Sequence, residues 1–111
     1  INTHISELVD ILERYKDKNV VGFGAPARLA TITNFGQIDK NLISYIVDDS
    51  PLKEGKLSPG MHIPIRSRDE LLKNKPDILI VFAYEYIDSI YKFTKQFDVP
   101  HYQPIPPRKL K

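Results

Sequence analysis

The chain predicts an α/β fold, because short apolar runs alternate with amphipathic segments throughout its 111 residues. Runs rich in Val and Ile without polar alternation are typical of strands buried on both faces of a parallel sheet. Segments with apolar residues at helical spacing separate these runs, and such alternation implies crossover helices that cover both faces. We therefore expect a Rossmann-like three-layer fold with about five mostly parallel strands.

Composition indicates a single domain that covers residues 1–111, with 41% hydrophobic and 27% charged residues. The net charge of +2 comes from scattered basic residues, which argues against a nucleic-acid partner. No apolar run reaches the roughly 20 residues that span a bilayer, and the first residues lack the layout of a signal peptide. We expect a cytoplasmic location and no membrane partner. The start at Ile1 suggests a fragment or a processed product.

The first half of the chain reads as two helix-strand pairs. An amphipathic helix ends in a polar run, and the apolar run after it closes on glycine. The second helix follows Pro26, which a first helical turn tolerates, and Gly36 can end it. A second strand ends at the pair Asp48 and Asp49. These segments are residues 5–16 (helix), 20–24 (strand), 27–35 (helix) and 42–47 (strand).

The second half opens with an unusually long loop, residues 50–62, whose prolines and glycines forbid long regular structure. Loops of this length are often functional, so this one is the second place to seek a site. A capping box of Ser67 and Glu70 predicts a helix start, with Leu71 and Leu72 facing inward. Prolines near the end of the chain predict that regular structure stops there and that a basic tail follows. The remaining segments are residues 63–65 (edge strand), 77–83 (strand), 85–97 (helix) and 101–105 (last strand).

A glycine-rich turn between the first strand and the second helix is the strongest local signal. In this G-x-G-x-x-A pattern the first glycine allows a tight turn, and the second lets a ligand approach the backbone. The helix start can bind an anion, and Arg28 can add a planar fork for a phosphate. The alternative is that the glycines only make a turn. The pattern is Gly22-Phe23-Gly24-Ala25-Pro26-Ala27.

Polar residues also follow the other strands. Asp48 lies where dinucleotide-binding folds place the acidic residue that holds a ribose hydroxyl, although a carboxylate here can equally cap the following turn. Tyr84 and Glu85 follow the strongest strand and would face the ligand crevice, while Glu85 can equally cap a helix. We find no catalytic set, because the three histidines lack partners at useful spacing, and the absence of cysteine excludes thiolate metal ligands.

Two blocks of sequence carry a resemblance. One is the glycine turn extended to Arg28, with Thr31 and Asn34. The other joins the acidic strand end to P-x-K-x-G and P-G-x-H-I-P-I segments, from Asp48 to Gly55 and from Ser58 to Ile65. Over roughly residues 5–106 the chain resembles the C-terminal domain of the S-adenosylmethionine-dependent sugar C-methyltransferases.

The resemblance implies the third part of a longer chain, after a zinc-binding part and a central part that binds S-adenosylmethionine. The family transfers a methyl group to a sugar carbon beside a keto group, using a base in the central part. This domain would then bind a nucleotide-diphosphate sugar and contact the other domains, with no catalytic or metal-binding residue and no cofactor of its own. Carried over by position, the site residues are Gly22, Gly24, Ala25, Pro26, Arg28, Asp48, Lys53 and His62, with Tyr84 at the crevice.

The chain departs from the family pattern at positions that bear on the ligand. Arg28 stands where lysine is usual, and Tyr84-Glu85 where Trp-Asn is usual. Two other readings stay open. One is a free-standing module that binds NAD or another nucleotide through the glycine turn and Asp48. The other is an interaction domain with an empty crevice.

Overall fold

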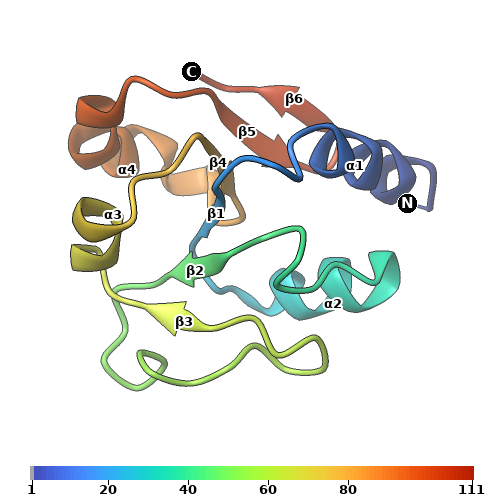
Figure 1. Cartoon of the computed structure of the whole chain (residues 1–111), viewed down its shortest axis with the longest axis horizontal. Coiled ribbons are helices and arrows are strands. Elements are labelled where there is room, and N and C mark those ends of the chain that lie inside the picture. The colour runs from blue at the N-terminus through green and yellow to red at the C-terminus, as the bar shows by residue number, and fades with distance from the viewer. Residues whose placement is uncertain (1) are drawn as a thin grey trace.

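The computed structural model describes residues 2–111 and contains one six-stranded sheet, in the order β3-β2-β1-β4-β5-β6 (Figure 1). The first five strands are parallel, and β6 runs antiparallel to β5. The α/β prediction is therefore confirmed, with one strand more than expected. The strands are β1 (Val20–Phe23), β2 (Tyr45–Val47), β3 (Ile65–Arg66), β4 (Ile78–Val81), β5 (His101–Pro104) and β6 (Pro107–Lys109).

Helices cover both faces of the sheet, as the alternating pattern predicts (Figure 1). One buried cluster joins α1 and α2 to the sheet through Leu8, Leu12 and Leu29, and the other joins α3 and α4 through Leu71 and Ile90. Two short 3₁₀ turns flank α4. The helical elements are α1 (Asn2–Arg14), α2 (Ala27–Gly36), α3 (Asp69–Lys73), η1 (Tyr84–Tyr86), α4 (Ile87–Thr94) and η2 (Lys95–Phe97).

The structure corrects two local predictions. The residues after Pro106 do not leave the fold as a tail, because β6 pairs with β5 and the amide of Gln103 donates to the carbonyl of Pro106 at 3.0 Å. The capping box at α3 does not form, since no side chain caps this helix and Leu72 is exposed. Consecutive residues of a helix point about 100° apart, so Leu71 is buried while Leu72 faces solvent.

The strand order places a crevice at one end of the sheet. The chain runs from β1 outward to β2 and β3, then returns to form β4 on the other side of β1. In open parallel sheets, ligands bind at the carboxyl ends of the strands at such a reversal of strand order. The segments that follow β1, β2 and β4 therefore contain the candidate site.

Candidate functional site

The two glycines of the turn have different roles. Gly24 follows β1 with a φ of +90°, and its amide donates to the Val47 carbonyl at 2.7 Å. A Cβ on it would lie 2.5 Å from that of Ala83. Gly22 lies inside β1, where a Cβ would overlap the side chain of Ile46. The prediction that Gly22 makes the tight turn is therefore wrong, because its small size serves packing within the core.

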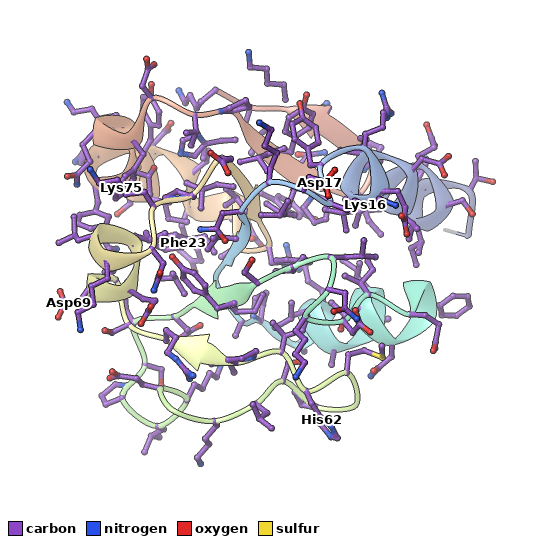
Figure 2. All side chains as sticks on the ribbon, viewed as in Figure 1. Lys16, Asp17, Phe23, His62, Asp69 and Lys75 are labelled. Atoms are coloured by element: carbon purple, nitrogen blue, oxygen red, sulfur yellow. The ribbon has the colours of Figure 1, made fainter. Side chains whose placement is uncertain are left out.

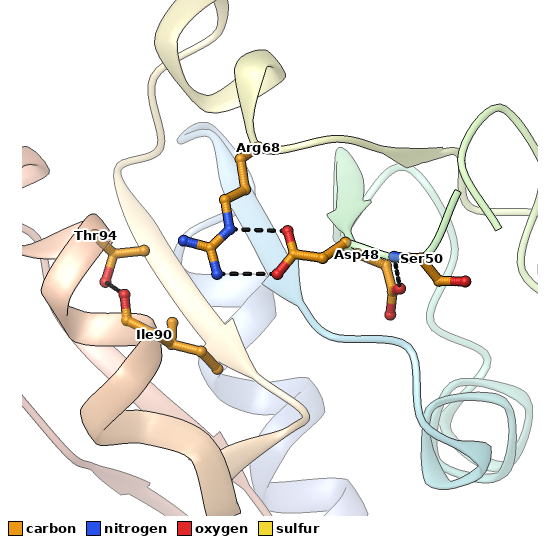
Figure 3. Close-up of polar contacts among 6 residues, drawn as sticks. Asp48, Ser50, Arg68, Ile90 and Thr94 are labelled. Carbon is orange, nitrogen blue, oxygen red and sulfur yellow. Dashed lines mark hydrogen bonds and ion pairs between the residues drawn. The ribbon is translucent and has the colours of Figure 1, made fainter. Parts of the chain in front are cut away.

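The Ala25 peptide is held from both sides. Its amide donates to Oδ2 of Asp48 at 2.8 Å, and its carbonyl accepts from Nζ of Lys53 at 2.7 Å. Oδ1 of Asp48 accepts from the Ser50 amide at 2.8 Å (Figure 3). The reading of Asp48 as a turn cap is thus confirmed, and its contact with a ribose stays a prediction. The long loop and the glycine turn form one unit.

A pocket of about 440 Å³ opens between the start of α2 and the long loop, and we call it the lysine pocket. Lys53 and Lys56 line it, and among residues 2–111 neither forms an ion pair. Sequence reasoning missed Lys56, although it follows Lys53 by three residues on a loop already marked as a candidate. The other lining residues are Ala25, Pro26, Ala27, Leu29, Ala30, Leu57, Pro59 and Ile65.

Arg28 and Tyr84 lie together, outside the lysine pocket. The Arg28 guanidinium forms two hydrogen bonds with the Glu85 carboxylate, and its central carbon lies 4.6 Å from the centre of the Tyr84 ring. Arg28 holds the pKa of Glu85 below its ordinary value. The fork that we expect to bind phosphate is therefore occupied by a carboxylate of the same chain. A pocket of about 330 Å³ lies beside this pair.

A third pocket, of about 260 Å³, lies at the carboxyl ends of β1, β2 and β4, and we call it the carboxylate pocket. Arg68 donates to both oxygens of Asp49, at 2.8 and 2.9 Å, as Figure 3 shows at Arg68. The sequence offered a signal for this pair, since Asp49 and Arg68 follow the neighbouring strands β2 and β3. The lining residues are Phe23, Gly24, Asp48, Asp49, Arg68, Ala83, Tyr86, Ser89 and Ile90.

His62 does not join the other predicted site residues. It is exposed, has a φ of +58° and lies on the outer side of the long loop, away from Phe23 (Figure 2). The turn around it fixes the loop, because Ser58 Oγ accepts from the Ile63 amide at 2.9 Å. A Cβ on Gly60 would overlap the side chain of Asn34. This second motif therefore packs the loop onto α2.

Residues 2–111 offer neither a cluster of metal-ligating side chains nor a helix that could span a membrane. No group of three or more His, Cys, Asp or Glu side chains in this range could hold a metal ion. No helix within it is long and apolar enough to cross a membrane.

Comparisons with known proteins agree on one family. The model of the C-methyltransferase C-terminal domain matches residues 1–102. The chain is also similar to the C-methyltransferase NovU of Streptomyces niveus, with 31% identity over 80 residues. That alignment covers 72% of this chain and 19% of the relative, so the chain spans about a fifth of the relative's length.

Proposed function

The chain belongs to the C-methyltransferase C-terminal domain family, as its two motif blocks predict, and from this premise we propose that it binds the nucleotide-linked sugar that a longer methyltransferase methylates. The lysine pocket is the observation that carries this proposal. Its volume of about 440 Å³ falls within the range of small-molecule sites.

The chemistry of the lysine pocket suits a nucleoside diphosphate. The ammonium groups of Lys53 and Lys56 can bind phosphate oxygens in charge-assisted hydrogen bonds. The Leu29 amide of α2 donates to the Pro26 carbonyl at 2.9 Å, and the amides of Ala27 and Arg28 before it can attract an anion. Leu29, Leu57 and Ile65 offer an apolar wall to a base or a deoxysugar. The pocket thus combines groups that favour negative charge with groups that favour an apolar ligand.

Methyl transfer itself belongs to the rest of the proposed enzyme. The family resemblance assigns the S-adenosylmethionine site, the zinc site and the base to parts that precede this domain. The role of residues 2–111 is then to bind and orient the sugar, and orientation supplies a large part of the rate in reactions between two substrates. Contacts with those other domains are part of the same proposal.

The alternative, an NAD-type module, has less support. In such a module a free acidic side chain after the second strand binds the ribose. Asp48 instead accepts hydrogen bonds from the amides of Ala25 and Ser50.

A titration of the chain with thymidine diphosphate (dTDP), S-adenosylmethionine and NAD, followed by amide NMR, tests the proposal. We expect dTDP alone to shift the amides of residues 24–30 and 53–58. The double variant Lys53→Ala/Lys56→Ala should weaken dTDP binding by about tenfold or more, because it removes two charged donors. The charge-matched variant Lys73→Ala/Lys92→Ala, on α3 and α4, should bind like the wild type.

Other outcomes would contradict the proposal. Binding of NAD in place of dTDP would favour the alternative module. Shifts with S-adenosylmethionine would mean that this domain holds the methyl donor. Equal effects of the two double variants would place the diphosphate outside the lysine pocket.

A further inference from the structure

The long loop divides into a fixed arm and a turn that has few contacts with the rest of the fold. The arm covers residues 55–65. Its Ile65 amide donates to the Lys56 carbonyl at 2.8 Å. Its Ser58 amide donates to the Ile63 carbonyl, also at 2.8 Å, and both of these residues are fully buried. The arm is therefore held in place by paired backbone groups and by its buried side chains.

The turn, residues 51–54, is held much more weakly, and we call it the lid turn. Its four residues are exposed, and the amides at its end donate locally, to the Ser50 carbonyl. Within residues 2–111, the one hydrogen bond that ties it to another part of the fold runs from Nζ of Lys53 to the Ala25 carbonyl, at 2.7 Å. The position of the lid turn thus depends on a single side chain.

The lid turn also has a hinge and an exposed apolar side chain. Gly55, which joins it to the arm, has a φ of +82°, and no atom lies within 4 Å of the position that a Cβ would take. Leu52 is 79% exposed, so most of its side chain lies in water. Rotation about Gly55 that covers Leu52 is favourable, because it removes apolar surface from water.

The two lysines of the lysine pocket respond differently to a phosphate. Lys56 lies on the arm, whose backbone is fixed. Lys53 lies on the lid turn, where a phosphate competes with the Ala25 carbonyl for its ammonium group. A hydrogen bond between two charged groups is stronger than one to a neutral carbonyl. The phosphate should therefore draw Lys53, and the lid turn with it, from the glycine turn toward the pocket.

We propose that the lid turn is a lid that the ligand itself closes. Lys53 holds it against the glycine turn in the free protein, and a diphosphate in the lysine pocket takes over Lys53 and draws Leu52 across the opening. This inference rests on the proposed function, since closure requires the diphosphate to lie in the lysine pocket. It adds a conformational step that encloses the ligand after it has bound.

The first test uses the free protein. Cleavage after Glu54 by a glutamyl endopeptidase, followed by mass spectrometry, measures how often the lid turn detaches. Lys53→Met should be cleaved there about fivefold faster than the wild type, because cleavage tracks the population of the detached turn and one hydrogen bond holds it. Lys56→Met, the matched control, keeps the bond to Ala25 and should be cleaved like the wild type. Equal rates for the two variants would overturn the role of Lys53.

The second test adds dTDP at a saturating concentration. Cleavage of the wild type after Glu54 should slow by about fivefold or more, because the closed lid turn detaches less often. Leu52→Ala should be cleaved like the wild type when free and should lose most of the protection that dTDP gives. Leu72→Ala is the control, because Leu72 is an exposed leucine on α3, and it should keep the full protection.

The outcomes separate the two proposals. If dTDP binds without slowing cleavage after Glu54, or protects Leu52→Ala as strongly as the wild type, the lid is overturned and the lysine pocket stands. If dTDP does not bind, the proposed function fails, and closure of the lid fails with it.

Discussion

Arg28 contacts three groups at once, namely the Glu85 carboxylate, the Phe82 carbonyl and the face of the Tyr84 ring. The ion pair is partly exposed, and such pairs contribute little to stability because solvent screens the two charges. A phosphate with two charges can therefore displace Glu85 from Arg28 at small cost. Both departures from the family pattern, at position 28 and at positions 84 and 85, meet in this one contact.

Glu85→Gln tests whether Arg28 can contribute to anion binding. We expect it to raise the affinity for dTDP by about threefold to tenfold, because it frees the fork of Arg28 and removes a nearby negative charge. Titration calorimetry would measure the change, with Glu13→Gln on α1 as the charge-matched control. Unchanged affinity in Glu85→Gln would place Arg28 outside the reach of the diphosphate.

Gly22 is a second residue whose role differs from its motif. Gly22→Ala should lower the free energy of unfolding by roughly 1–3 kcal/mol, the usual cost of an extra methyl group in a packed core. The atom in its way is Cδ1 of Ile46, which Ile46→Val removes. In a urea double-mutant cycle Gly22→Ala should therefore cost less in the Ile46→Val background. If the effects of the two substitutions on the free energy of unfolding simply add, overlap with Ile46 is not the cause of the destabilisation by Gly22→Ala.

At the scale of elements, His101 joins β5 to α4. Its side chain is fully buried, with Nε2 2.7 Å from Oγ1 of Thr94 and Nδ1 2.8 Å from the Val99 carbonyl. The Tyr91 ring lies edge-on to it, at 5.2 Å between ring centres. Burial lowers the pKa of His101, and the charge of Lys111 lowers it further. The contact between these elements therefore depends on a neutral imidazole.

This contact makes stability depend on pH. The unfolded chain takes up a proton at His101 near pH 6.5, while the folded chain does so only at lower pH. The free energy of unfolding should therefore fall as pH drops below about 6.5, since the unfolded state binds more protons. Urea unfolding at several pH values measures this slope. His101→Asn should reduce this slope, whereas substitution of the exposed His62 by Asn should leave it unchanged. Equal slopes in the wild type and both variants would refute this account.

At the scale of the whole molecule, the sequence was sufficient for the layers and for most of the strands. Short, fully apolar runs such as Ile78–Val81 are typical of strands buried on both faces, and the segments between them had helical spacing. The family followed from two motif blocks. The structure explains why they occur together, since Lys53 binds the Ala25 carbonyl and Gly60 packs against Asn34.

The last strand and the pairings of the site residues could not be predicted, because they depend on contacts between residues far apart in the sequence. β6 has little β propensity, with a proline and two basic residues, and forms only because β5 offers an open edge. The sequence suggested that the Arg28 guanidinium is free to bind a phosphate. Its partner Glu85 lies 57 positions away, so spacing could not reveal their ion pair. Spacing alone also could not show that Asp49 and Arg68 close one pocket, or that His62 lies outside the site.

The two hydrogen bonds of the Ala25 peptide make its amide hydrogen a probe of how often the glycine turn opens. Its amide hydrogen is donated to Asp48, so it can exchange with solvent deuterium only when the glycine turn separates from the segment after β2. The exchange rate of this one hydrogen thus measures how often the turn opens. Because Lys53 holds the carbonyl of the same residue, that rate also registers the motion of the long loop.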